Sequence, residues 1–272
     1  MTASAQAAVR DVAPWIEILA RVGYAAKAVL YGTIGFLAAR AAFGWDGGRA
    51  TDTRGALRAV RDAPFGRHIL LVIAAGLAGY GLWRLVEAVT DPEHRGTRPK
   101  GVAIRAGNAV RGLAHGALAL AAFRLGLGSG GARSQGPDGW TARALALPAG
   151  EVLVWVGAAA VAGYGVYQLY RAWKAKLGRH LALNRVSAGT GSVLVAVCRF
   201  GLAARGAVFG LIGFLLGRAA ARHDPGQAGG VRESLLTMAG FGRWALAAAG
   251  IGLVAYGVYQ LVEARYRRID VA

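Results

Sequence analysis

The sequence predicts an all-α integral membrane protein with six transmembrane helices, formed by three tandem two-helix repeats about a pseudo-threefold axis along the membrane normal. The first observation is composition, because 55% of the 272 residues are hydrophobic and only 17% are charged. A soluble domain of this length carries about a quarter charged residues. The second observation is a set of long apolar segments that contain many of the 42 glycines. The third is a residue pattern that recurs three times along the chain.

Six apolar segments are long enough to cross a hydrocarbon core about 30 Å thick, at a rise of about 1.5 Å per residue. Before the first of them, Pro14–Leu19 predicts a short interfacial helix. No signal peptide is recognisable, so we expect the spans themselves to direct insertion. The six segments are approximately Val22–Phe43, Ile69–Val89, Ala106–Leu125, Val152–Tyr170, Phe200–Leu216 and Trp244–Val262.

The repeats align on three features: an Arg-x-Gly helix start, a basic residue six positions after that Arg, and a Tyr-Gly pair in the second span. The starts are Arg21, Arg105 and Arg199, the basic residues are Lys27, Arg111 and Arg205, and the tyrosines are Tyr80, Tyr164 and Tyr256. Two spans per repeat bring every repeat into the membrane from the same side, so both termini share one face. The predicted division is an N-terminal interfacial segment, 1–20, and repeats 21–99, 100–190 and 191–272, which together form one membrane domain.

Between the two spans of each repeat, the sequence predicts a short helix on the membrane surface followed by a glycine turn. In repeat 1, Thr53–Arg61 has helical spacing and precedes the turn Pro64–Arg67. Gly240–Arg243 occupies the matching position in repeat 3. Leu145–Gly150 occupies the matching position in repeat 2, although Pro148–Glu151 replaces the Pro-Phe-Gly-Arg motif there.

The net charge of +18 raises two classes of partner, nucleic acids and membrane surfaces. Basic residues are separated by apolar segments rather than gathered in one patch, which excludes a nucleic-acid partner and favours anionic headgroups of the lipid bilayer. Arg171–Arg185 is a basic amphipathic stretch suited to an anionic leaflet. Lys and Arg are more frequent in the termini and inter-repeat segments than in the intra-repeat loops. This excess predicts a multi-pass protein of the bacterial cell (inner) membrane with both termini cytoplasmic.

The repeat motifs carry a resemblance to a known family. The helix start Arg21-x-Gly23, the loop helix Gly55–Arg58, the turn Pro64–Arg67 and the closing segment Gly79–Arg84 match its pattern closely. With these motifs the chain resembles an uncharacterised bacterial membrane family, catalogued as domain of unknown function 1206. The resemblance covers nearly the whole chain after residue 20. It implies six helices in three repeats, and it implies no activity.

The basic column, Lys27, Arg111 and Arg205, is the first candidate site. Each residue lies about 9 Å along its helix from the leading Arg. Cations within a membrane usually face the bundle interior or a water-filled cavity, so the basic column could form a ring that binds an anion or a phosphate headgroup. Alternatively, the side chains extend to the cytoplasmic surface with Glu87 and Glu263 as partners.

Four further residues are candidate interior polar groups. Tyr80, Tyr164 and Tyr256 are flanked by small residues, and they either line a polar pathway or fill the space between closely packed helices. His115 replaces an aromatic residue of the other repeats. It either relays protons or packs with a hydrogen bond.

The sequence lacks the motifs that are typical of disulfide-bonded, metal-binding or catalytic sites. Cys198 is the one cysteine, which excludes an internal disulfide. No ligand cluster for a metal, no nucleophile elbow and no phosphate-binding loop is present, so we expect no metal, no cofactor and no catalysis. The first hypothesis is a non-enzymatic bundle that acts through lipid or protein partners. The alternative is a channel or transporter for anions or small solutes along the pseudo-threefold axis. A membrane enzyme would need a polar pocket that the sequence does not reveal, and a homo-oligomer is left open.

Overall fold

The computed structural model describes residues 3–45, 48–91, 96, 98–129, 136–174 and 188–266, and its regular structure there is entirely helical. Its long helices are α1 (Ala3–Phe43), α3 (Gly66–Thr90), α4 (Pro99–Gly126), α6 (Gly150–Lys174), α8 (Ala188–Ala221) and α10 (Arg243–Tyr266). The short elements are α2 (Thr53–Arg61), α5 (Pro137–Leu145), the 3-10 turn η2 (Pro225–Gln227) and α9 (Val231–Gly240).

Within the described ranges, five helical segments are long and apolar enough to cross a membrane. They are Arg21–Phe43, Gly66–Thr90, Gly150–Lys174, Gly189–Ala221 and Arg243–Tyr266. The remaining long helix, α4, contains Asn108, Arg111 and His115, which lower its hydropathy. Its membrane crossing therefore stays a prediction.

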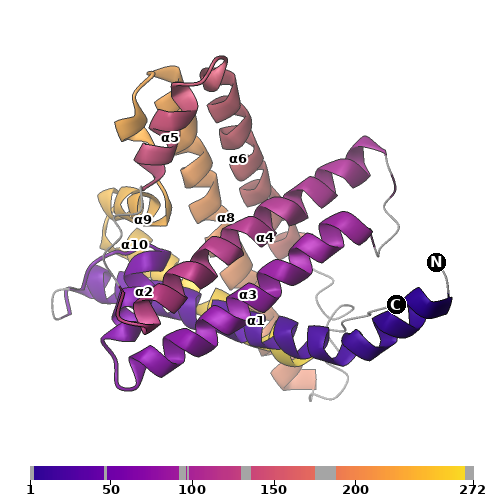
Figure 1. The fold of residues 1–272 in the computed structure, drawn as a ribbon. Coiled ribbons are helices and arrows are strands. Elements are labelled where there is room, and N and C mark those ends of the chain that lie inside the picture. Colours follow the sequence, from indigo (N-terminus) through magenta and orange to yellow (C-terminus); the bar gives the residue numbers. More distant parts are fainter. Residues whose placement is uncertain are drawn as a thin grey trace.

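The most extensive helix contacts join neighbouring repeats. α3 packs against α4 and α6 against α8, so the second helix of one repeat lies along the first helix of the next. α10 packs against α1 in the same way and brings the end of repeat 3 back to the start of repeat 1. Figure 1 shows the α3–α4 pair and the α6–α8 pair running in clearly different directions.

Glycines allow these neighbouring helices to approach closely. A Cβ added to one glycine of each second helix would lie 3.0 Å or less from a carbonyl oxygen of the facing first helix. The pairs are Gly81 with Gly112, Gly165 with Gly206 and Gly257 with Ala28, at 2.9, 2.7 and 3.0 Å. Small residues at such positions maximise van der Waals contact between membrane helices.

Repeat 2 differs from the others in its internal packing. α1 packs against α3 and α8 against α10, but α4 and α6 form no comparable pair in the described part of the chain. A Cβ added at Gly23 would lie 2.5 Å from Cβ of Tyr80, and one at Gly201 would lie 2.3 Å from the backbone nitrogen of Tyr256. The corresponding Gly107 of α4 would meet no atom within 4 Å. The two helices of repeat 2 are therefore separated.

The predicted loop helix of repeat 1 is confirmed as α2. Its N-cap, Asp52, accepts a hydrogen bond from the backbone N–H of Gly55 at 2.8 Å, which satisfies an unpaired donor of the first turn. Leu57 and Val60 are buried on one face. α2 is therefore held against the core by an amphipathic face, and α5 and α9 occupy the matching positions in the other repeats.

The predicted glycine turn before the second helix is present in repeat 2, although this repeat lacks the Pro-Phe-Gly-Arg motif. Phe65 and Ala149 both have φ of 58°, in the left-handed region. Gly66 and Gly150 follow them, and an added Cβ would lie 2.1 and 2.0 Å from the carbonyl oxygens of Val60 and Ala144. In repeats 1 and 2 the turn depends on this glycine and not on the Phe and Arg that repeat 2 lacks. In repeat 3 the equivalent Gly242 itself has a φ of 111°, and an added Cβ would meet no atom within 4 Å.

The N-terminal segment also differs from the prediction. Pro14–Leu19 is part of the continuous helix α1 rather than a separate interfacial helix. Of the basic stretch Arg171–Arg185, residues 175–185 lie outside the described part of the chain.

Candidate functional site

The basic column and the tyrosines meet at the centre of the molecule, where all six long helices contribute a side chain. In every repeat the cation lies over the tyrosine ring of its own repeat. From the ring centroid, the Lys27 Nζ to Tyr80 distance is 4.4 Å, Arg111 Cζ to Tyr164 is 5.1 Å and Arg205 Cζ to Tyr256 is 4.8 Å. These separations are typical of cation–π contacts. We call these six residues the central cluster.

Arg205 makes the most contacts. Its side chain is buried, and its Nε donates to the hydroxyl of Tyr31 at 3.1 Å while Nη1 donates to the hydroxyl of Tyr164 at 3.0 Å. Its guanidinium also lies 4.3 Å from the centroid of the Phe209 ring. One arginine therefore connects helices of all three repeats.

Lys27 is buried as well and is linked to a polar network. The Gln260 amide satisfies its neighbours when its nitrogen donates to Glu263 at 2.9 Å. Its oxygen then accepts from Lys27 Nζ at 3.1 Å and from the hydroxyl of Tyr256 at 2.9 Å. Glu263 is thus connected to Lys27 through an amide rather than by direct contact.

Arg111 is the most accessible member of the basic column. Its side chain is half-buried, and Nη1 donates to Oδ1 of Asn108, a buried residue one turn away, at 3.3 Å. Among the described residues, no ion pair joins any member of the basic column to a carboxylate. Glu87 instead pairs with Arg84 at 2.5 Å, and Glu263 accepts from the hydroxyl of Tyr259 at 2.7 Å. The central cluster therefore carries positive charge without a directly bound carboxylate.

A second aromatic residue contacts each tyrosine from the next repeat. The ring centroids are 4.7 Å apart for His115 and Tyr80, 5.3 Å for Phe209 and Tyr164, and 4.7 Å for Tyr31 and Tyr256. The Nδ1 of His115 lies 2.8 Å from the carbonyl oxygen of Arg111, at hydrogen-bonding distance. Each tyrosine is thus held between a cation of its own repeat and a ring of the following repeat.

The leading arginines form a contact that the sequence did not reveal. Each donates to the last carbonyl groups of the second helix in the preceding repeat. Arg21 bonds Ala264 and Arg265 at 2.6 and 3.0 Å, Arg105 bonds Ala88 and Val89 at 2.8 and 3.0 Å, and Arg199 bonds Ala172 and Trp173 at 2.9 and 2.5 Å. The last carbonyl groups of a helix carry the negative end of its dipole, which favours a cation there. The recurrence of Arg at one repeat position was the signal for this role.

Arg171 also has a role that the sequence did not reveal. It occupies the position of Glu87 and Glu263 in the other repeats, and its Nη2 donates to the hydroxyl of Tyr259 at 3.1 Å. That hydroxyl donates in turn to Glu263. The exchange of an acidic for a basic residue in repeat 2 thus creates a link from α6 to α10.

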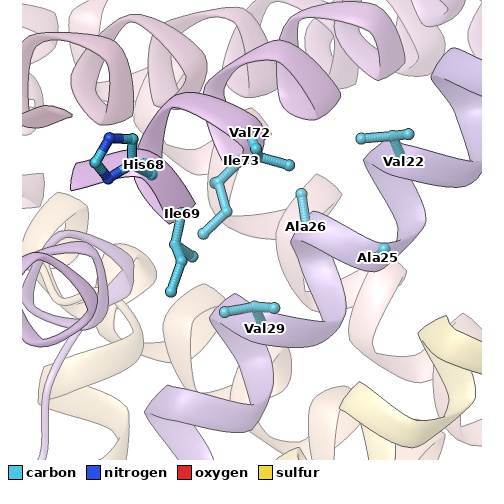
Figure 2. A pocket seen from close by; sticks show the side chains of 8 residues that line it. All are labelled: Val22, Ala25, Ala26, Val29, His68, Ile69, Val72 and Ile73. Carbon is cyan, nitrogen blue, oxygen red and sulfur yellow. The ribbon is translucent and has the colours of Figure 1, made fainter. Parts of the chain in front are cut away.

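An apolar groove of about 300 Å³ lies between α1 and α3. Figure 2 shows Ile69 and Ile73 of α3 facing Ala26 and Val29 of α1 across it. His68 is the one titratable residue of its lining. The groove has apolar walls and does not include the central cluster.

Comparison with known proteins identifies the three repeats. Residues 22–91, 106–175 and 200–267 each match the family described as Domain of Unknown Function (DUF1206). The chain belongs to this family. Among relatives of this DUF1206 protein, the uncharacterized protein YxxB of Bacillus subtilis (strain 168) is 29% identical over 264 residues, which cover 96% of this chain and 94% of the relative. No solved structure matches the chain. The family resemblance, the internal repeats and the membrane-like helices are therefore confirmed.

Proposed function

We propose that this DUF1206 protein is a non-enzymatic protein of the bacterial cell membrane that binds an anionic lipid headgroup at the central cluster. The observation that carries this proposal is the convergence of Lys27, Arg111 and Arg205 without a directly bound carboxylate. Cations are costly within a membrane and, where present, commonly mark a binding or transport function.

We further propose that all six long helices span the membrane around a pseudo-threefold axis, with both termini cytoplasmic. The recurring pairings of second with first helices, including α10 with α1, support the axis. The polar residues of α4 have interior partners: Arg111 contacts Tyr164 and His115 contacts Tyr80. A helix that directs its polar groups inward can cross a bilayer despite a modest hydropathy.

The chemistry of the central cluster suits a phosphate diester. Guanidinium N–H groups form charge-assisted hydrogen bonds with phosphate oxygens, and a lysine ammonium adds a point charge. The aromatic rings keep the cations in place before a ligand binds, which lowers the ordering cost of binding. An anionic phospholipid is the partner with this chemistry that is abundant in a bacterial membrane.

The test is retention of phosphatidylglycerol by the purified full chain during detergent washing, measured by native mass spectrometry. We expect a triple variant, Lys27→Gln, Arg111→Gln and Arg205→Gln, to bind phosphatidylglycerol at least about tenfold more weakly than the wild type. The control removes equal charge from exposed positions, with Arg67→Gln, Arg124→Gln and Arg143→Gln, and should bind like the wild type. Equal retention by the triple variant and the wild type would contradict the proposal.

The convergent cations also favour a second candidate, a pathway for anions along the axis. Tyrosine, glutamine and arginine side chains occupy the centre, so we expect only background chloride flux from liposomes containing the wild-type protein. Flux well above background that disappears in the same triple variant would replace the headgroup proposal with conduction.

A further inference from the structure

We infer that the separation between α4 and α6 is a lateral site for one anionic phospholipid of the leaflet on the side of the chain termini, with its phosphate at Arg111. We call this space the repeat 2 gap; it lies between the faces of α4 and α6 that carry Gly107, Arg111, Ala114, Gly157, Val161 and Tyr164. The inference rests on the proposed function. It adds how the lipid binds, and that the lipid enters from the side between the two helices of repeat 2.

The repeat 2 gap is visible in the exposure of corresponding residues. Tyr80 and Tyr256 are 3% and 4% exposed, whereas Tyr164 is only half-buried. Gly107 has no neighbouring atom within 4 Å of an added Cβ, although its counterparts in the other repeats touch the second helix. The gap therefore opens the central cluster toward the lipid phase at Tyr164 and Arg111.

The amino-acid sequence of repeat 2 keeps this space open. Side chains that pack between the two helices of the first and third repeats are replaced in repeat 2 by smaller ones at three successive levels. Leu30 and Val208 correspond to Ala114, Leu77 and Leu253 to Val161, and Ile73 and Ala249 to Gly157. The six residues of repeats 1 and 3 are buried, whereas Ala114 is exposed and Val161 and Gly157 are half-buried. Small side chains leave room that an acyl chain can fill without unpacking the helices.

The order of residues along the helices matches the polarity of a phospholipid. α4 runs away from the side of the termini and α6 runs back toward it, since Arg105 at the start of α4 bonds the end of α3. Arg111 and Tyr164 are thus nearer to the termini, and Ala114, Val161 and Gly157 lie progressively deeper. A lipid of that leaflet would place its phosphate at Arg111 and one acyl chain along the small side chains.

Charge distinguishes repeat 2 as the site for an anion. Repeats 1 and 3 carry Glu87 and Glu263 near the corresponding helix end, whereas repeat 2 carries Arg171, which adds a positive charge there.

The experiment compares the affinities of the full-length protein for phosphatidylglycerol and phosphatidylcholine by native mass spectrometry in detergent. Ala114→Leu and Val161→Leu each install the residue of repeat 1 and should weaken binding of both lipids about fivefold, because they fill the acyl-chain space. Arg111→Gln should weaken the binding of phosphatidylglycerol about fivefold and leave the binding of phosphatidylcholine unchanged. Ala248→Leu, exposed on α10, is the matched control and should leave both affinities unchanged.

The outcomes separate this inference from the proposed function. If the two leucine variants keep the helical circular dichroism spectrum and bind both lipids as tightly as the wild type, the repeat 2 gap is not the site. That result overturns the inference. The headgroup proposal still stands in that case if the triple glutamine variant no longer binds phosphatidylglycerol. If the triple variant also retains phosphatidylglycerol, both are overturned. Because Ala114→Leu and Val161→Leu are separate variants, the test can still be made with one of them if the other fails to fold.

Discussion

Single side chains at the centre of this protein are held by aromatic rings and hydroxyl groups rather than by ion pairs. Arg205 illustrates the arrangement, because it lies over the Tyr256 and Phe209 rings and donates to the hydroxyls of Tyr31 and Tyr164. Such contacts keep the positive charge uncancelled while fixing its position. The headgroup proposed to bind at the central cluster would meet this buried positive charge.

Replacing Arg205 with lysine should destabilise the protein although the charge is kept. An ammonium cannot reproduce the planar fork that reaches two hydroxyls at once, so we expect a loss of roughly 2 kcal/mol in the free energy of unfolding. Titration with a denaturing detergent, followed by circular dichroism, measures this quantity. Arg218→Lys, at an exposed position, is the control. Equal stability of the two variants would show that the hydroxyl contacts contribute nothing.

The leading arginines should contribute to stability through the helix ends that they cap. Arg105→Ala removes two hydrogen bonds to the carbonyls of Ala88 and Val89, so we expect a loss of about 1–3 kcal/mol in the free energy of unfolding. The same unfolding titration measures this loss. The control is Arg124→Ala, because Arg124 is exposed near the other end of α4. A larger effect of Arg124→Ala would refute the capping role.

At the scale of helices, glycine decides how closely the repeats can pack. Gly165 of α6 faces Gly206 and Gly210 of α8, where an added Cβ would lie 2.7 Å from the Gly206 carbonyl oxygen and from the Gly210 nitrogen. Gly163, two residues earlier on the same helix, would meet no atom within 4 Å. Two glycines that look alike in the sequence therefore have different structural roles.

This contrast gives a matched pair of substitutions. Gly165→Ala should force α6 and α8 apart and lower the free energy of unfolding by about 1–3 kcal/mol. Gly163→Ala should leave stability unchanged or raise it by up to about 1 kcal/mol, because alanine is the better helix former. Unfolding titrations of the two variants, measured side by side, compare their free energies of unfolding. Equal destabilisation would mean that α6 and α8 are less tightly packed than described.

At the scale of the whole molecule, the repeats are linked by second helices that pack on the first helices of their neighbours, and repeat 2 is the open member of the set. This arrangement makes the central cluster a product of all three repeats. Loss of any one repeat would remove both a cation and a tyrosine from it.

The membrane crossing of α4 can be tested with single cysteines in a Cys198→Ala background. Arg98→Cys precedes α4 and Ser129→Cys follows it, and both positions are exposed. With cytoplasmic termini, we expect a membrane-impermeant maleimide to label Ser129→Cys in intact cells and Arg98→Cys only after permeabilisation. Labelling of both from the same side would show that α4 does not cross the membrane.

The sequence by itself determined the helical membrane class, the three repeats, the position of α2 and the residues of the basic column. Each of these follows from hydropathy, from helical spacing or from a recurring residue, which are properties of a local segment. Only the tertiary structure shows that Arg21 bonds the end of α10 and that Arg205 contacts tyrosines of all three repeats. It also decided that α4 and α6 are separated. A residue pattern fixes the face on which a side chain lies, but the distance between two faces depends on how every helix packs at once.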